Sequence, residues 1–106
     1  MRIIARSTLI RYASLPGRSA VRRALDDWHR VAADADWPTP HAIKASFGNA
    51  SIINRDRVVF NIAGNKHRLI ASLDYPRRIL FILWIGTHAE YDDIDAATVT
   101  YERPSP

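Results

Sequence analysis

RVVFNIAGNKHRLIASLDYPRRILFILWIGTHAEYD, residues 57–92, is the stretch that decides the fold of this chain. It contains two runs rich in apolar and β-branched residues, 57–63 and 67–73, which are typical of strands. Between them stands Gly64-Asn65, a pair that suits a two-residue hairpin turn because such a turn requires positive φ. The stretch therefore predicts a β-hairpin, followed by a third strand.

The register of this hairpin sorts its residues into two unlike faces. With Gly64 and Asn65 as the loop, Asn61 lies opposite Arg68, and directly opposed residues share a face of the sheet. One face is predicted to be buried and consists of Val58, Phe60, Ile62, His67, Leu69, Ala71 and Leu73. The other consists of Arg57, Val59, Asn61, Lys66, Arg68, Ile70 and Ser72. The second face is more polar than core packing requires, and it suits an anion.

The third predicted strand covers residues 79–85. Its sequence, ILFILWI, is apolar at every position, which is typical of a strand buried on both faces or of a buried helix segment. The short length and the β-forming residues favour the strand. We place it beside the second strand, after a tight turn near residues 76–77.

This third strand brings further polar groups to the same corner. The predicted register sets Arg68 opposite Ile85 and Lys66 opposite Thr87. Three side chains then follow directly beside the cationic pair: His88, Glu90 and Tyr91. The expected result is a polar cluster at one end of the sheet.

The composition predicts one domain, residues 1–106, because a chain of 106 residues with 47% apolar content can bury a core without staples. The absence of cysteine excludes a disulfide framework, a zinc finger of the usual kind and a thiol nucleophile. It also fits a reducing, cytoplasmic location. The longest apolar run has seven residues, whereas a membrane-spanning helix needs about 20. We therefore expect no contact with a membrane.

The charge is unevenly distributed along the chain. The net charge of +4 suits an anionic partner, and residues 1–25 hold six arginines and no acid, whereas acids dominate from Ala89 onward. This pattern indicates either two different contacts or two solvated faces that neutralise one another. We interpret the basic segment as part of the fold rather than as an organellar transit peptide.

The rest of the chain predicts helices that pack on this sheet. From Ser19 to Asp34, apolar residues recur at three- and four-residue steps, which predicts an amphipathic helix with Ser19 as its N-cap and an Asp26–Arg30 ion pair. The other predicted elements are a strand over 2–5, a helix over 7–14, a helix over 40–47 capped by Thr39, a strand over 50–53, a turn over 54–56, a helix over 89–97 and a loose tail over 101–106. Together they predict an α+β domain of two layers, with N-terminal helices on a mostly antiparallel sheet.

Metal and serine chemistry find little support in the sequence. His88-Ala89-Glu90 resembles the His-x-Glu of zinc deaminases, but the companion Pro-Cys-x-x-Cys is excluded in a chain without cysteine. The four histidines show no pairs at i,i+4, and no Gly-x-Ser-x-Gly turn is present. We therefore expect no metal and no cofactor.

A set of cations, amides, a histidine and a tyrosine can cleave RNA. RNA supplies its own nucleophile, the 2′-hydroxyl, so the protein needs a base for that hydroxyl, positive charge for the phosphorane and an acid for the 5′-oxygen. Lys66 and Arg68 suit the charge, since a planar guanidinium matches two phosphate oxygens. His88 titrates near neutrality and suits base or acid. Tyr91 suits stacking on a base, sharing a proton or bracing His88.

Each of these residues also has a structural interpretation. The alternatives are a turn position for Lys66, an ion pair with Glu90 or Asp92 for Arg68, a helix cap for His88 and packing on Trp84 for Tyr91. The catalytic interpretation rests on their convergence at one corner. Substrate binding is assigned to Asn61, Lys44 and Arg57; the alternative for Lys44 is a solvated side chain. His67 lies on the apolar face and is interpreted as a hydrogen-bonded core histidine.

Three motifs resemble the HigB-type toxins of bacterial toxin–antitoxin pairs, within the wider RelE-like group. They are Ile43-Lys44-x-x-Phe47, Val59-Phe60-Asn61-Ile62-x-Gly64-Asn65-Lys66-x-Arg68-Leu69-Ile70 and Thr87-His88-x-Glu90-Tyr91-Asp92. The resemblance implies a RelE-like fold and metal-free endoribonuclease action on mRNA at the ribosome. It also implies a cognate HigA-type antitoxin with a helix-turn-helix domain. The functional residues that it implies are Asn61, Lys66, Arg68, His88 and Tyr91, with Arg68 and His88 foremost.

Two other functions fit the same scaffold. One is a non-catalytic toxin, like the ParE-type members that act on gyrase. The other is an RNA-binding module without chemistry, in which the basic N-terminal helices, including Arg18 and Arg22, would dominate binding.

Overall fold

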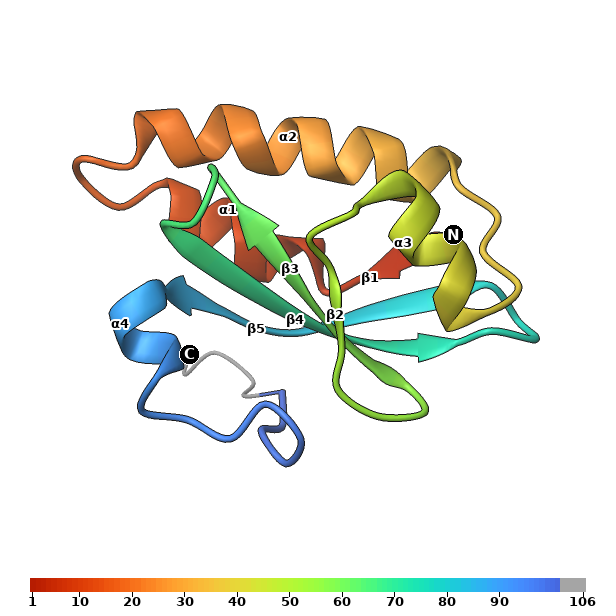
Figure 1. Cartoon of the computed structure of the whole chain (residues 1–106). Helices are drawn as coiled ribbons and strands as arrows, with labels where there is room; N and C mark the ends of the chain where they lie inside the picture. Colours follow the sequence, from red (N-terminus) through yellow and green to blue (C-terminus); the bar gives the residue numbers. More distant parts are fainter. Residues whose placement is uncertain (102–106) are drawn as a thin grey trace.

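The computed structural model describes residues 1–101 of the chain. Its elements are β1 (Arg2–Ile4), α1 (Arg6–Ala13), α2 (Ser19–Asp34), α3 (Pro40–Ser46), β2 (Ser51–Ile52), β3 (Arg57–Ile62), β4 (His67–Asp74), β5 (Ile79–Thr87) and α4 (His88–Tyr91) (Figure 1). Within this range every helix is too short or too polar for a membrane span. Of the tail predicted over 101–106, only Tyr101 lies inside the described residues.

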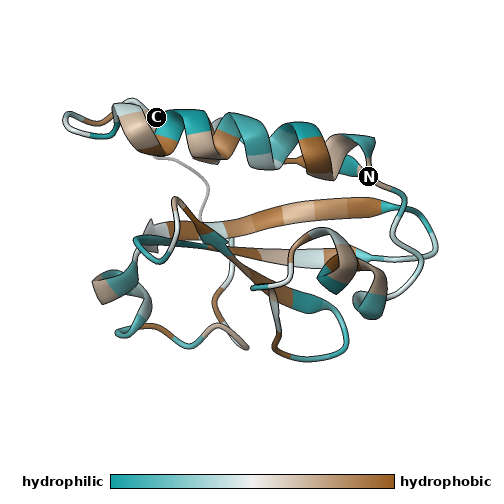
Figure 2. Cartoon of the chain, turned by 45° about the horizontal axis from the view of Figure 1, so that its top comes forward, coloured by the Kyte–Doolittle hydropathy of each residue, from teal (hydrophilic) through white to brown (hydrophobic). Residues whose placement is uncertain are grey.

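The five strands form one sheet in the order β1-β5-β4-β3-β2. β1 runs parallel to β5, whereas the other neighbouring strands are antiparallel. α1 and α2 cover one face of the sheet, and α4 with the segment after it lies on the other (Figures 1 and 2). This arrangement confirms the predicted α+β class, with N-terminal helices packed on a mostly antiparallel sheet.

Each face of the sheet has its own apolar cluster. The larger one fills the layer under α1 and α2, where the ring of Phe60 lies 5.3 Å, centroid to centroid, from those of Trp28 and Phe47. The smaller one lies on the opposite face, where Val59 and Ile70 pack against the segment after α4. The predicted buried face of the hairpin is therefore correct. The opposite face is apolar in its middle and polar toward the turn.

The β3–β4 hairpin has the predicted register, with Asn61 opposite Arg68. Its turn differs from the prediction, because positive φ falls at Ala63 and Gly64 rather than at Gly64 and Asn65. The strands end at Ile62 and His67, so the reversal uses four residues and not two. Asn65 is thereby released from the left-handed conformation, and its side chain contributes to the site described below.

The predicted register of β5 holds at one end of the strand and is wrong by one residue at the other. Ser72 lies opposite Phe81, as predicted, but a β-bulge between Ile70 and Ala71 changes the pairing beyond it. As a result Arg68 lies opposite Gly86 instead of Ile85. A bulge inserts one extra residue into one strand and changes the side-chain alternation along it.

The N-terminal half follows the prediction, with small corrections. Thr39 caps α3 by accepting a hydrogen bond from the Ala42 N–H at 3.4 Å. Ser19 is the first residue of α2 rather than its N-cap and makes no capping bond, since the chain reaches helical geometry there from Arg18. Arg30 pairs with Asp27 at 3.3 Å and not with Asp26, because the i,i+3 position lies within its reach.

The C-terminal helix is shorter than predicted. α4 ends at Tyr91, whereas the sequence pattern predicts a helix over 89–97. The side chain of Asp95 accepts a hydrogen bond from the Ala97 N–H at 3.0 Å. Such a local bond gives the backbone an alternative to the helix, so the chain after α4 forms turns.

Candidate active site

Arg68 is the buried cation of the corner where β4, β5 and α4 meet. Its side chain is held by the hairpin turn, because Nη1 donates to the Asn65 carbonyl at 3.0 Å and to the His67 carbonyl at 3.2 Å. Nη2 donates to the side-chain oxygen of Asn65 at 2.5 Å. The residue is only 9% exposed and is the one buried charged residue within 1–101. The guanidinium is thus fixed in place, as a preorganised anion-binding group must be.

The ring of Tyr91 lies beside Arg68. The guanidinium carbon is 5.9 Å from the centroid of the Tyr91 ring, within cation–π range. The same ring is 6.4 Å from that of Trp84, which belongs to the apolar cluster of this face. Tyr91 therefore packs on Trp84 and also lies beside Arg68. The half-buried ring leaves part of its surface for a ligand.

α4 is short, and its position is set by a capping box. The Thr87 N–H donates to Glu90 Oε1 at 2.8 Å, and the Glu90 N–H donates to the Thr87 hydroxyl at 3.1 Å. The bond from the Thr87 backbone is the largest cause that lowers the pKa of the Glu90 carboxyl. The carboxylate is therefore occupied in holding the helix start.

His88 is the first residue of α4 and reaches solvent. Its backbone N–H donates to the Lys66 carbonyl at 2.9 Å, which ties α4 to the hairpin turn. Its imidazole is 48% exposed, with Nε2 3.8 Å from a carboxylate oxygen of Asp92. An exposed pair of this kind contributes little to stability.

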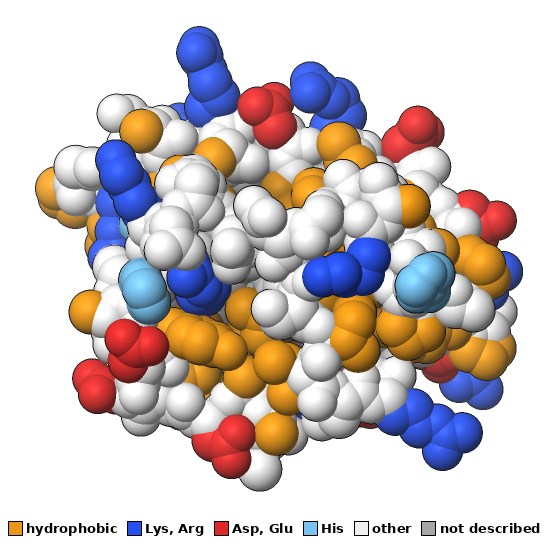
Figure 3. All heavy atoms as spheres, in the orientation of Figure 1, with side chains coloured by type: hydrophobic (Ala, Val, Ile, Leu, Met, Phe, Trp, Pro, Cys, Tyr) orange, Lys and Arg blue, Asp and Glu red, His pale blue; other side chains and the backbone are white. Residues whose placement is uncertain are grey.

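The structure brings most of the predicted site residues together. Lys66 is exposed on the turn, and Asn61 is half-buried on the neighbouring strand opposite Arg68. The set gathered at this corner is Asn61, Lys66, Arg68, His88 and Tyr91. On the side of α4, Figure 3 shows basic side chains and a histidine above a group of acidic ones.

Lys44 and Arg57 lie away from this corner. Arg57 Nη1 donates to the carbonyls of Ala96 at 2.9 Å and Val99 at 2.5 Å, so it fastens the segment after α4 to β3. Lys44 Nζ donates to the Ala50 carbonyl at 2.7 Å and closes the loop after α3. Both cations thus have structural partners, and their assignment to substrate binding stays a prediction.

Sequence reasoning missed two residues that support the corner from the other face of the sheet. The Tyr12 hydroxyl lies 2.7 Å from His67 Nδ1, and the Arg18 guanidinium carbon lies 3.8 Å from the centre of the Tyr12 ring. Burial is the main cause that lowers the pKa of His67, and Arg18 and Lys66 act in the same direction. No local sequence pattern indicates the contact between Tyr12 and His67, which are 55 positions apart.

Metal-binding side chains do not gather in the described part of the chain. Within residues 1–101 no three His, Asp or Glu side chains are placed as ligands of one ion.

Comparison with known proteins identifies the family. A sequence profile described as HigB toxin, the RelE-like toxic component of a toxin–antitoxin system, matches residues 21–94. The chain belongs to this HigB family. Among characterised relatives, the mRNA interferase HigB of Escherichia coli O6:H1 is 32% identical over 73 residues, which cover 67% of this chain and 71% of the relative.

The HigB-family match covers the residues of the corner but not Tyr12 and Arg18, which support it from the other face of the sheet. All five gathered residues, from Asn61 to Tyr91, lie within the matched residues 21–94. Both Tyr12, in α1, and Arg18, directly before α2, precede that stretch. As a HigB-family protein, the chain is the toxic component of a toxin–antitoxin pair, and its partner is an antitoxin.

Proposed function

We propose that this HigB-family toxin is an endoribonuclease that cleaves mRNA at the ribosome in the bacterial cytoplasm. The observation that carries the proposal is the fixed position of Arg68, whose guanidinium is held by the hairpin turn and lies 5.9 Å from the Tyr91 ring. The backbone of His88 is bonded to the same turn. The name of the Escherichia coli relative, an mRNA interferase, supports the same activity. A HigA-type antitoxin with a helix-turn-helix domain is the proposed partner.

Arg68 is the group that stabilises the transition state. A guanidinium has five N–H donors, and three of its bonds are made to Asn65 and His67. The two remaining donors are available for oxygens of the scissile phosphate. Because the residue is buried, its charge acts in a medium of low dielectric constant, where it is worth more than in water. Lys66 adds a second, mobile positive charge.

His88 carries the proton transfer. The RNA 2′-hydroxyl attacks the adjacent phosphorus, its proton leaves to a base, and the 5′-oxygen leaves with a proton from an acid. The products are a 2′,3′-cyclic phosphate and a 5′-hydroxyl. An exposed imidazole next to Asp92 can perform either transfer near neutral pH. Tyr91 supplies an aromatic surface on which an unstacked base can lie.

The test is to map transcript ends in cells that express the chain, the His88→Ala variant or the control His41→Ala. His41 is an exposed histidine on α3, away from the corner. We expect wild type and the control to produce new 5′-hydroxyl ends. His88→Ala should slow cleavage by about 10²–10⁴-fold, the usual contribution of a positioned acid or base.

The same experiment decides against the proposal if His88→Ala cleaves like wild type. Growth arrest with intact transcripts and a DNA-damage response would instead indicate a gyrase inhibitor of the ParE type. Purified chain that binds RNA without cutting it, with or without ribosomes, would indicate a binding module.

A further inference from the structure

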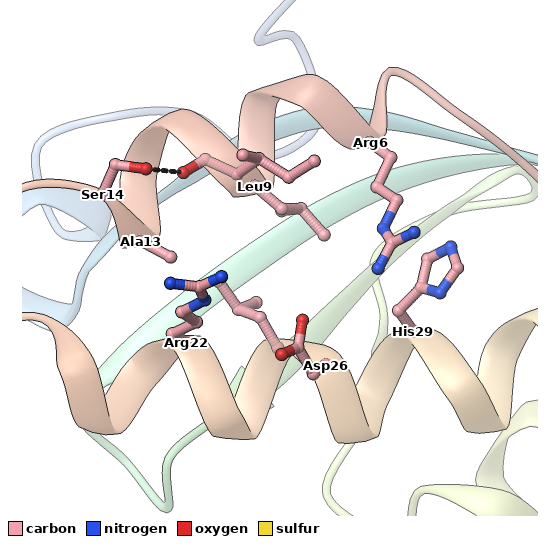
Figure 4. A pocket seen from close by; sticks show the side chains of 9 residues that line it. Arg6, Leu9, Ala13, Ser14, Arg22, Asp26 and His29 are labelled. Atoms are coloured by element: carbon pink, nitrogen blue, oxygen red, sulfur yellow. Dashed lines mark hydrogen bonds between the residues drawn. The ribbon is translucent and has the colours of Figure 1, made fainter.

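A groove between α1 and α2 is a second feature of this molecule, outside the candidate active site. Its volume is about 360 Å³, and side chains from both helices line it (Figure 4). In Figure 4, Arg6 extends from α1 toward His29, and Arg22 extends from α2 toward α1. The groove belongs to the helical layer, on the other side of the sheet from α4.

The groove combines an apolar wall with apolar residues left in solvent. Leu9 and Leu25 line it and belong to the main core. Ile10 also lines it and is 56% exposed, and Leu15, just after α1, is 50% exposed. Within residues 1–101 only four large hydrophobic side chains are exposed; Ile10 lines the groove, and Leu15 follows Ser14, another lining residue, in the sequence. Exposed apolar groups beside a groove are typical of a surface that a protein covers.

The charge around the groove is positive. Arg6 and Arg22 line it, and neither forms an ion pair within the described residues 1–101. Burial and the nearby Arg6 lower the pKa of His29, which keeps this imidazole neutral at pH 7. Asp26 is the one acid that lines the groove.

We propose that this groove binds an acidic, amphipathic segment of the cognate antitoxin. Apolar side chains of the segment would cover Ile10 and Leu15, and its carboxylates would pair with Arg6 and Arg22. The proposal rests on the place of the chain in a toxin–antitoxin pair, but it does not depend on the RNA chemistry of the corner.

The alternative occupant, RNA, fits the groove less well. A nucleic-acid surface is read mainly through phosphates, and it gains little from exposed Ile10 and Leu15. A peptide with both apolar and acidic side chains matches the exposed Ile10 as well as Arg6 and Arg22.

The test uses the cognate antitoxin, the protein encoded by the reading frame next to that of this chain. One arm measures growth of cells that express the chain with and without the antitoxin. The other measures, by calorimetry at low and high salt, the affinity of the purified chain for the purified antitoxin. The groove variant carries Arg6→Glu and Arg22→Glu, and its matched control carries Arg23→Glu and Arg55→Glu, two exposed arginines outside the groove.

We expect the groove variant to arrest growth like wild type but to escape neutralisation. Its Kd should rise by about a hundredfold or more, since each reversed charge at a charged interface costs about tenfold in affinity. The control should match wild type, and wild-type affinity should fall at high salt. Ile10→Ser should also weaken binding without altering the fold, whereas Val31→Ser, an exposed apolar position on α2, should not.

Two results would overturn the proposal. One is a groove variant and an Ile10→Ser variant that bind the antitoxin with wild-type Kd. The other is a groove variant that binds the antitoxin normally but no longer arrests growth, which would make the groove an RNA or ribosome surface. A wild-type chain that arrests no growth would contradict the proposed function instead, and the calorimetry would still decide the role of the groove.

Discussion

The backbone N–H of His88 donates to the carbonyl of Lys66 at 2.9 Å, so the first residue of α4 is fixed to the last residue of the β3–β4 turn. The same turn holds the guanidinium of Arg68 through Asn65. One four-residue reversal therefore positions both groups that the proposed RNA cleavage requires. Its geometry is expected to matter as much as the identity of the catalytic side chains.

Asn65→Ala tests whether the turn positions Arg68. The variant removes the side-chain acceptor of Arg68 Nη2, so the guanidinium gains freedom. We expect cleavage to slow by about tenfold to a hundredfold, as small misplacements of a catalytic group do. The melting temperature should change little, because Asn65 is exposed.

The matched control is Asn49→Ala, at an exposed position in the loop after α3. RNA-cleavage rates of the purified variants provide the measurement. A wild-type rate for Asn65→Ala would show that Arg68 needs no such support.

Gly86→Ala tests the close packing under the corner. A Cβ at Gly86 would overlap the six-membered ring of Trp84 and lie 3.1 Å from Glu90 Oε1. The variant must displace Trp84, against which Tyr91 packs, so the free energy of unfolding should fall by about 1–3 kcal/mol. Gly48→Ala is the control, because a Cβ there meets nothing within 4 Å. Urea unfolding of both variants measures the difference, and equal stabilities would refute this packing argument.

Stability should depend on pH through His67. Burial, Arg18 and Lys66 lower the pKa of His67 below 6.5 in the folded chain, against the raising effect of Glu90. The unfolded chain therefore takes up a proton at a higher pH than the folded chain. The stabilising contribution of neutral His67 is fully present above pH 6.5. It is lost as the pH falls from there through the pKa of His67 in the folded chain.

His67→Gln should flatten this decline in urea unfolding measured across the acid range. His29 has a pKa lowered in the same direction, so part of the decline should remain. His41→Gln, an exposed position on α3, should leave the profile as in wild type. An unchanged profile for His67→Gln would show that burial does not disfavour protonation of His67 in the folded chain.

The hairpin could be predicted from sequence because its polar and apolar residues alternate. One face is apolar throughout, and a register slip would expose it, so Asn61 and Arg68 had to face each other. No such signal exists in 79–85, where every residue is apolar. The bulge that sets Arg68 opposite Gly86 therefore could not be predicted from the hydrophobic pattern.

The contacts that support the corner from the other face of the sheet could not be predicted from the sequence either. Tyr12 and His67 meet only because α1 packs on the sheet, and nothing local to either residue indicates this. Arg57 looked like a cation for a substrate, yet its guanidinium binds backbone carbonyls of the segment after α4. Charge alone does not separate a ligand contact from a structural one.

Arg57→Gln distinguishes these two roles. Loss of the bonds to the Ala96 and Val99 carbonyls should lower the free energy of unfolding by about 1–3 kcal/mol and raise hydrogen exchange after α4. Substrate binding by Arg57 predicts instead a weaker affinity for RNA with unchanged unfolding. Urea unfolding and RNA binding, measured on the same preparation, separate the outcomes.

The most direct measurement of the central claim is a double-mutant cycle of RNA cleavage with Arg68→Gln, His88→Ala and the double variant. If the two side chains act on one phosphate, each single variant should lose most of the rate enhancement. The double variant should then be about as slow as the slower single variant. Independent effects that multiply in the double variant, or a wild-type rate in either single variant, would contradict a shared catalytic centre.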